Sequence, residues 1–334
     1  MTDTEVLFLR SDELSDLATP AEYVEAVREG YREVGEGAAA EPRTKLVNQS
    51  PPGMLTGYMA VLPGMGAMGG YMYAAGFSDR DAHFFLPLFD AESGRPKALL
   101  DGASLNPFKT GAAGGVAVDE LARPDATALA LFGSGAQARG QLRAAVAVRD
   151  LETVEVYSPT KEHREGFAAE MNEQLTASVA AVASPDAAVE GADIVVTATD
   201  ASDPVFDEEM LEEGTHVTVM GQYDADKREV DATAVERATY VPDLRARAHQ
   251  DAGAFLQAVE EGVIGEDHIH AELGEVVAGA AEGRTDRTEI TLFDSGGTGV
   301  ETVAAAQMLY ENARDEGLGE LVDFAPASEA LTGE

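Results

Sequence analysis

Cysteine is absent from the 334 residues of this chain. Disulfide bridges, thiolate nucleophiles and cysteine-ligated metal sites are therefore excluded. The sequence also has no run of about 18 apolar residues that could span a membrane. Its N-terminus, "MTDTEVLFLRSDELSD", lacks the basic and apolar regions of a secretory leader. From these absences we expect a cytoplasmic protein that does not act at a membrane.

Basic residues are also scarce in this sequence. Lysine and arginine number 23 against 61 acidic residues, only five of the 23 are lysines, and the net charge is −38. The acidic residues recur along the whole chain, which is typical of surfaces that stay hydrated at high salt in halophilic archaea. Screening over about 3 Å at molar salt makes such self-repulsion tolerable. The charge argues against binding nucleic acid or anionic membranes, because both require positive patches.

The length exceeds the usual limit for one hydrophobic core and predicts two domains. From Thr110 onward, short apolar strands alternate with helices, a pattern that predicts a doubly wound parallel sheet of the Rossmann type. We place this α/β domain at residues 123–299. Residues 1–122 and 300–334 then form a discontinuous α+β domain for substrate binding and dimerisation, because the tail helix over 299–319 is expected to pack back on the N-terminal part.

Within the N-terminal part, a helix is expected to begin near Thr19 and Pro20 and to end at Gly35 or Gly37. Residues 53–100 carry strand-like pieces such as "GGYMYAAGF" and "HFFLPLFD" and predict an antiparallel or mixed sheet. The segment "AESGRP" at 91–96 reads as a hairpin loop between two of these strands.

The stretch "LALFGSGAQARGQLRAA" at 129–145 matches a dinucleotide-binding turn. Gly133, Gly135 and Ala138 occupy the three small positions of a G-x-G-x-x-G/A fingerprint, with a strand before them and a helix after them. The glycines permit the tight turn, and the amides of the following helix would bind a pyrophosphate. The residues expected to contact the cofactor are Gly133, Ser134, Gly135, Ala136, Gln137, Ala138, Arg139, Ser158, Thr160, Lys161, Thr197, Ala198, Thr199 and Gly221.

The tip of the second strand bears on the choice between NAD(H) and NADP(H). An NAD-type site usually offers a carboxylate to the ribose hydroxyls there. This chain has Ser158, Thr160 and Lys161 instead, with His163 and Arg164 just beyond. Hydroxyls and cations suit a ribose phosphate, so the sequence favours NADP(H), with NAD(H) as the alternative.

The chain resembles the ornithine cyclodeaminase and mu-crystallin family, which also contains archaeal alanine dehydrogenases and ketimine reductases. The resemblance covers nearly the whole chain, in blocks such as "EPRTKL", "LFDAESGRPKALLDG", "KTGAAGGVAVDELARPDATALALFGSGAQAR" and "ELGEVVAGAAEGRTDRTEITLFDSGGTGVE". It implies a homodimer with a Rossmann domain, and hydride transfer between nicotinamide and the nitrogen-bearing carbon of a small amino or imino acid.

The resemblance also implies roles for single residues. Arg43 in "EPRT" matches the arginine that binds the substrate carboxylate, a role for which a bidentate guanidinium is suited. Lys109 matches a second arginine of the family; it keeps the positive charge but cannot form the bidentate hydrogen bonds of a guanidinium. The ungapped match puts Met72 at the position of the family's catalytic lysine and Gly57 at that of a glutamate that contacts the far amine of ornithine. A thioether cannot donate a proton, so Met72 would leave the lysine's role vacant.

Two acids of the family fall on other residue types as well. One is matched by Tyr223 and the other by Thr302, and a shift of one residue would bring Asp224 and Glu301 into their places. We therefore consider Lys109, Tyr223 and Asp224 as candidate proton donors. A histidine before "FFLPLF", His83, is a further candidate, although a packed strand residue is the simpler interpretation.

Three functions remain open at this stage. The first is an NAD(P)-dependent oxidoreductase or deaminase that acts on a small amino or imino acid other than ornithine, and Arg43 and the glycine turn favour it. The second is ornithine cyclodeaminase activity itself. The third is a non-catalytic NADP(H) or small-ligand binding protein of the mu-crystallin type, which Met72 would favour. His268 and His270 in "EDHIHAEL" are interpreted as part of a solvated loop, and no metal is expected.

Overall fold

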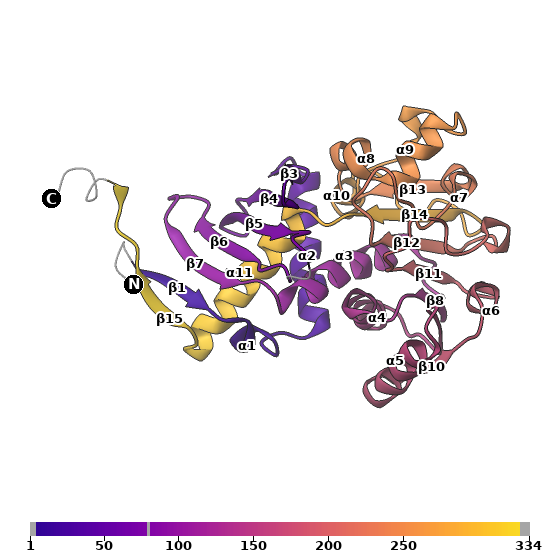
Figure 1. Cartoon of the computed structure of the whole chain (residues 1–334), viewed down its shortest axis with the longest axis horizontal. Helices are drawn as coiled ribbons and strands as arrows, with labels where there is room; N and C mark the ends of the chain where they lie inside the picture. The colour runs from indigo at the N-terminus through magenta and orange to yellow at the C-terminus, as the bar shows by residue number, and fades with distance from the viewer. Residues whose placement is uncertain (1–4, 79–80, 328–334) are drawn as a thin grey trace.

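The computed structural model describes residues 5–78 and 81–327 and contains two β-sheets that lie side by side (Figure 1). The first sheet is built mainly from the N-terminal third of the chain, and the second from residues 128–295. Residues 1–4, 79–80 and 328–334, which belong to the predicted discontinuous domain, lie outside the described residues. The domain boundaries at 122/123 and 299/300 stay a prediction.

The first sheet has eight strands in the order β15-β1-β7-β6-β5-β4-β2, with β3 pairing with β4. Its strands are β1 Glu5–Leu9, β2 Ala39–Ala40, β3 Thr44–Gln49, β4 Pro52–Leu62, β5 Ala67–Ala75, β6 Phe85–Asp90, β7 Pro96–Asp101 and β15 Glu320–Asp323. The predicted hairpin forms between β6 and β7, which are antiparallel. The mixed sheet expected over 53–100 is present, and strand β15 brings the end of the chain back beside β1.

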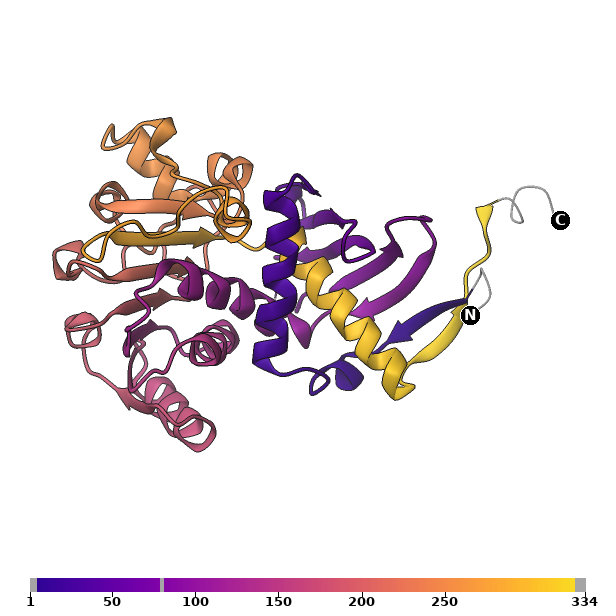
Figure 2. The ribbon, with the colours of Figure 1, turned by 180° about the vertical axis from the view of Figure 1, so that it is seen from behind.

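Helices α2 (Pro20–Gly35) and α11 (Gly299–Glu316) pack against the first sheet and against each other, and α3 (Leu105–Leu121) packs against both helices. Figure 2 shows α2 and α11 crossing one face of that sheet. Helix α2 begins where the sequence predicts, because Thr19 and Glu22 form a reciprocal capping box and Pro20 occupies the first turn. The tail helix α11 packs on the N-terminal sheet, as expected for a discontinuous domain.

The second sheet has seven parallel strands in the order β10-β9-β8-β11-β12-β14-β13. They are β8 Ala128–Phe132, β9 Thr153–Tyr157, β10 Ser178–Ala181, β11 Ile194–Thr197, β12 His216–Met220, β13 Ala238–Pro242 and β14 Ile290–Ser295. The strand order reverses between β8 and β11, so a crevice opens at their carboxyl ends, where such folds bind ligands. The predicted doubly wound α/β fold is confirmed.

Helices and short turns of helix join these strands (Figure 1). They are α4 Ala136–Val148, α5 Lys161–Gln174, α6 Pro185–Val189, η1 Glu208–Met210, α7 Ala232–Arg237, α8 Arg245–Asp251, α9 Gly253–Glu260, η2 Glu266–His268 and α10 Leu273–Val277. A further short helix, α1 Ser11–Leu14, lies between β1 and α2. Over the described residues, no helix is long and apolar enough to cross a membrane.

Candidate active site at the junction of the two sheets

The glycine turn between β8 and α4 has the geometry that a dinucleotide requires. Gly133 has a φ of +114°, and a Cβ built on it would lie 2.4 Å from the Ala198 carbonyl oxygen, so a side chain is excluded at this position. A Cβ on Gly135, by contrast, meets no atom within 4 Å. The amide end of α4, a helix of 13 residues, therefore opens on free space at the carboxyl edge of the sheet. This cradle fits a pyrophosphate.

Side chains around the turn hold its shape. The Arg139 guanidinium pairs with Glu170 and donates from Nη1 to the Ser134 carbonyl oxygen at 2.7 Å. Arg139 is therefore engaged within the loop and is not directed at a ligand. The Ser134 hydroxyl donates to the Ser158 hydroxyl at 3.1 Å and joins the turn to the end of β9.

The end of β9 carries no carboxylate. Ser158 is buried, and the Arg164 guanidinium donates to its carbonyl oxygen at 2.9 Å, with Thr160 and Lys161 following at the surface. Lys161 is about two thirds exposed and lies 3.6 Å from a Glu165 carboxylate oxygen. The arrangement offers hydroxyls and two nearby cations to a group bound at this edge.

Of the residues predicted after β11 and β12, Ala198, Thr199 and Gly221 face the crevice, whereas Thr197 does not. Thr197 is fully buried and donates its hydroxyl to Glu229 at 3.0 Å. Glu229 also accepts from the Thr199 amide and hydroxyl, each at 2.7 Å, and so fixes the loop that lines the crevice. Burial raises the pKa of Glu229 to about 7, although the Thr199 and Thr197 hydrogen bonds oppose the shift.

A cavity of about 300 Å³ lies where this crevice meets the first sheet and helix α3. Its walls come from both sheets: Arg43, Tyr58, Tyr73, Ala75, Ala82, Phe84, Asn106, Lys109, Thr110, Gln137, Ala198, Thr199, Asp200, Met220, Gly221, Tyr223, Ser295, Gly296 and Gly297. Residues as distant in sequence as Arg43 and Gly297 thus meet in one space. A small ligand bound there would lie next to the glycine turn.

Arg43 is 5 % exposed and lies beside two aromatic rings. Its Cζ atom lies 4.0 Å from the Tyr223 ring centroid and 5.0 Å from that of Tyr58. One terminal nitrogen donates to the Gly296 carbonyl oxygen at 2.7 Å, while the buried Nε and Nη1 atoms have no partner among the described residues. Two unsatisfied donors on a buried cation call for an anionic acceptor.

Lys109 supplies a second buried positive charge in the cavity wall. Its ammonium donates to the Glu301 carboxylate at 3.2 Å and to the Tyr58 hydroxyl at 3.3 Å. Burial by itself lowers the pKa of Lys109, but Tyr58 and Glu301 outweigh that effect and raise the pKa above its ordinary value. Lys109 therefore stays protonated at neutral pH.

Met72 and Gly57 do not belong to this site, contrary to the sequence-based assignment. They pair with each other across β4 and β5 on the outer face of the sheet, and Met72 is 52 % exposed. The described residues that line the cavity include neither. Alternate residues of a strand point to opposite faces, so a shift of one residue moves a side chain out of the site. The inward residues of β5 are Tyr71 and Tyr73, and Lys109 Nζ lies 5.3 Å from the Tyr71 ring centroid.

The two pairs of neighbouring residues considered for the family's acids also differ in which side chain faces the cavity. Glu301 is fully buried and bonds to Lys109, whereas its neighbour Thr302 donates to the Thr298 carbonyl oxygen within α11. Tyr223 lines the cavity, but Asp224 is exposed and its carboxylate accepts from the Asp226 amide. The shift from Thr302 to Glu301 therefore restores a buried acid beside Lys109, whereas the shift from Tyr223 to Asp224 does not bring an acid into the cavity.

The three histidines singled out in the sequence lie outside the cavity. His83 is exposed and lines a different hollow beside Phe85. His268 and His270 each contact a backbone carbonyl oxygen, those of Val235 and Glu282 respectively, at 2.8 Å. Their ring nitrogens are thereby used in holding loops.

A buried ion network supports the loop over 295–297. Arg247 donates to Asp243 at 2.7 Å and to the Asp294 carboxylate at 2.8 Å. Asp243 in turn accepts from the Ser295 hydroxyl at 2.8 Å and from the Gly296 amide at 3.1 Å. The Gly296 carbonyl oxygen accepts the hydrogen bond from Arg43. By fixing Gly296, the network therefore helps to position the Arg43 guanidinium in the cavity. Sequence patterns could not assign this role, since the pairs span up to 53 residues.

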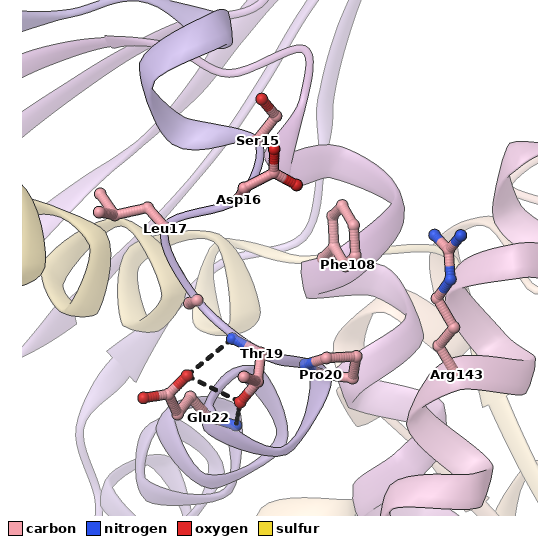
Figure 3. A pocket seen from close by; sticks show the side chains of 9 residues that line it. Ser15, Asp16, Leu17, Thr19, Pro20, Glu22, Phe108 and Arg143 are labelled. Atoms are coloured by element: carbon pink, nitrogen blue, oxygen red, sulfur yellow. Dashed lines mark hydrogen bonds between the residues drawn. The ribbon is translucent and has the colours of Figure 1, made fainter. Parts of the chain in front are cut away.

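A hollow at the start of α2 is an alternative candidate for a ligand-binding site (Figure 3). It lies between Asp16, the capping residues Thr19 and Glu22, and the side chains of Phe108 and Arg143. The Glu22 carboxylate is occupied by the Thr19 amide and hydroxyl, and Arg143 donates to Gln174 at 2.7 Å. Because the Glu22 carboxylate and the Arg143 guanidinium are already paired, this hollow offers no comparable reason to bind a ligand.

Known proteins share this architecture. A Delta(1)-pyrroline-2-carboxylate reductase of Bacillus cereus is 38 % identical over 238 residues, which are 71 % of this chain and 73 % of that protein. The Delta(1)-pyrroline-2-carboxylate reductase of Thermococcus litoralis, solved with NADH and L-proline, superposes with a TM-score of 0.89 at 33 % identity and covers 95 % of this chain and 100 % of its own. An archaeal alanine dehydrogenase dimer with bound NAD superposes with a TM-score of 0.89 at 31 % identity, over 96 % of this chain and 100 % of its own.

The model of the Ornithine cyclodeaminase/mu-crystallin family matches residues 6–317, which is nearly the whole chain. The strands of the second sheet, the glycine turn and the residues that line the cavity all lie within that match. The chain therefore belongs to the ornithine cyclodeaminase/mu-crystallin family.

Proposed function

We propose that this protein is an NAD(P)-dependent oxidoreductase that transfers hydride between nicotinamide and the nitrogen-bearing carbon of a small amino or imino acid. The observation that carries the proposal is Arg43, a buried cation with two unpaired donors, in a cavity beside a dinucleotide turn. Relatives named for reduction of pyrroline-2-carboxylate and for oxidation of alanine support the reaction class.

In the proposed complex, the unpaired donors of Arg43 bind the substrate carboxylate. The rings of Tyr223 and Tyr58 both contact the guanidinium and restrict its orientation, and with it the orientation of the bound carboxylate. Lys109 adds positive charge behind the site, and Glu301 keeps that charge in place. The bound cofactor supplies the hydride, and these side chains orient the acceptor carbon and exclude water from it.

The shape of the cavity supports a compact substrate. Its walls include the rings of Tyr58, Tyr73 and Phe84, and the Glu301 carboxylate is already paired with Lys109. A ring such as pyrroline-2-carboxylate would place apolar carbons against those rings. A long substrate with a distal ammonium, such as ornithine, would not gain Glu301 as its acceptor.

One assay tests the proposed reaction. Absorbance of reduced nicotinamide is followed in high salt across 2-oxo acids with ammonia or methylamine, cyclic imines such as pyrroline-2-carboxylate, and, in a separate arm, ornithine. We expect turnover with at least one imine and no proline formation from ornithine. Tight cofactor binding without turnover on any compound would favour the non-catalytic binding function, and rapid proline and ammonia formation from ornithine would favour the cyclodeaminase.

For the cofactor, we propose NADP(H) over NAD(H). Ser158 and Thr160 place hydroxyl groups where a carboxylate would repel a ribose phosphate, and Arg164 lies against the Ser158 carbonyl. The structures of relatives contain NADH or NAD, so this preference would distinguish the chain from them.

A fluorescence titration in high salt is expected to give tighter binding of NADPH than of NADH, by about tenfold, because a charge-assisted hydrogen bond contributes about 1.5–3 kcal/mol. Ser158→Asp should reverse the order by repelling the phosphate. Ser178→Asp is the matched control and should change the ratio little, since Ser178 is exposed at the start of β10, away from the carboxyl edge of the sheet. Equal affinities in the unaltered protein would contradict the proposal.

We further propose that the chain forms a homodimer through the outer face of the first sheet. The other face of this sheet is covered by helices, whereas Leu55, Met59, Met72 and Phe85 lie on the outer face and are 45 %, 66 %, 52 % and 57 % exposed. A contiguous apolar sheet face of this kind marks a protein interface. A second copy is the occupant we infer, because a relative of the same fold is a dimer.

The oligomeric state tests this interface. In molar salt, where repulsion between copies is screened, sedimentation should give about twice the 35.0 kDa chain mass. Met59→Glu with Met72→Glu should give monomers, because four charges would be buried per dimer. Met59→Leu with Met72→Leu is the control and should stay dimeric. A dimer that survives the glutamates would place the interface elsewhere.

A further inference from the structure

We propose that Tyr58 is the general acid that delivers a proton to the substrate nitrogen, with Lys109 and Glu301 as its positioning residues. The inference rests on the proposed function and adds the proton donor that reduction of an imine requires. Once a hydride reaches the carbon of a C=N bond, the electron pair of the double bond moves to nitrogen. That nitrogen must then gain a proton from a neighbouring group.

Tyr58 lies on the inner face of β4, between the two cations of the cavity. Its ring centroid is 5.0 Å from Arg43 Cζ and 5.2 Å from Lys109 Nζ. A substrate whose carboxylate is bound by Arg43 therefore has its nitrogen-bearing carbon next to the Tyr58 side chain. Two flanking positive charges also stabilise the phenolate that remains after proton transfer.

The hydrogen bond to Lys109 leaves the phenol proton free. A protonated ammonium can only donate, so the Tyr58 oxygen accepts in the 3.3 Å contact with Lys109 Nζ. No described residue accepts a hydrogen bond from the Tyr58 hydroxyl, and the side chain lines the cavity. Its proton is therefore available to an acceptor bound in that cavity.

The other tyrosines near the site are placed less well. The Tyr71 hydroxyl donates to the Gly102 carbonyl oxygen at 2.7 Å and does not line the cavity. Burial raises the pKa of Tyr73, and no ammonium is bonded to its oxygen among the described residues. The ring centroid of Tyr223 lies 4.0 Å from Arg43 Cζ, and the side chain is more than a third exposed.

Lys109 is also a poorer donor than Tyr58. Its ammonium is paired with Glu301, and proton loss would leave a buried carboxylate without a counter-charge. In the proposed step the hydride adds to carbon, the C=N electron pair moves to nitrogen, and the Tyr58 O–H bond breaks as the N–H bond forms. The product amine and a phenolate paired with Lys109 result, and water reprotonates the phenolate after product release.

A binding experiment tests the placement of the phenol without turnover. Pyridine-2-carboxylate and benzoate have the same carboxylate and ring size, but only the first presents a nitrogen acceptor beside the carboxylate. Calorimetry is carried out with and without oxidised nicotinamide dinucleotide. Tyr58→Phe should lower the affinity for pyridine-2-carboxylate about 3- to 10-fold, the range of one hydrogen bond. The affinity for benzoate should change less than about 2-fold. Tyr71→Phe is the matched control and should leave the ratio of the two affinities unchanged.

Turnover gives the second measurement, on the substrate that the absorbance panel identifies. Tyr58→Phe should lower kcat about 10²- to 10⁴-fold with little change in KM, as expected for loss of a general acid. Equal weakening of both ligands, no preference of the unaltered protein for pyridine-2-carboxylate, or an unchanged kcat would overturn the proposal. A protein that turns over no imine at all would instead refute the proposed function, and the two failures are thereby distinguished.

Discussion

Replacing Arg43 by methionine is expected to lower kcat/KM about 10²- to 10³-fold, mainly through KM. Truncating one partner of a buried, hydrogen-bonded charge pair costs about 2–5 kcal/mol, and the substrate carboxylate would be left in the cavity without its counter-ion. Arg43→Lys should recover part of this loss, because lysine keeps the charge but cannot form two parallel hydrogen bonds. Steady-state kinetics with the substrate identified by the panel measures both effects.

The same substitution is expected to leave thermal stability unchanged or to raise it. In the unliganded protein the Nε and Nη1 atoms of Arg43 are buried without partners, and methionine removes that desolvated charge while filling similar volume. Arg247→Met is the contrasting control. Arg247 is buried with its charge paired to Asp243 and Asp294, so its removal should cost about 3–5 kcal/mol of unfolding free energy. Strong destabilisation by Arg43→Met would show that Arg43 is a structural residue.

Unfolding temperature is expected to rise steeply with salt. The chain carries a net charge of −38, and the repulsion among its carboxylates favours the unfolded state at low ionic strength. The Debye length falls from about 10 Å at 0.1 M salt to about 3 Å at 1 M, so most of that repulsion is screened over this range. A gain of a few kcal/mol corresponds to roughly 10 °C for a protein of this size.

Potassium chloride is the salt for this measurement, because sulfate also strengthens apolar burial. Differential scanning calorimetry is carried out from 0.1 to 2 M, with sucrose at matched osmolality as a control that does not screen charge. An unfolding temperature that does not depend on potassium chloride, or that rises equally in sucrose, would refute adaptation of this surface to high salt.

Local patterns in the sequence predicted those parts of the fold that local chemistry determines. The capping residues Thr19 and Pro20 mark the start of α2, and the segment over 91–96 forms the hairpin between β6 and β7. The turn at Gly133 needs a positive φ and close approach to Ala198, and a glycine at that spacing after a strand is a strong signal for it. These features depend on a few neighbouring residues.

The cavity could be predicted only in part, because side-chain direction and long-range contacts decide it. The sequence predicts Met72 in the site and does not indicate Tyr58, although β4 and β5 both lie within a predicted sheet region. A difference of one residue in register decides which side chains of a strand face inward. Lys109 and Glu301 are 192 residues apart, and no local pattern brings them together.

Transfer of a labelled hydride tests the central claim most directly. Nicotinamide deuterated at C4 is supplied in its reduced form with the preferred imine in unlabelled water and molar salt, and the product is examined by mass spectrometry and NMR. We predict one deuterium per product molecule, bound to the carbon that carries nitrogen. Product formed without deuterium at that carbon, or no product from any imine despite tight cofactor binding, would contradict hydride transfer as the function of this protein.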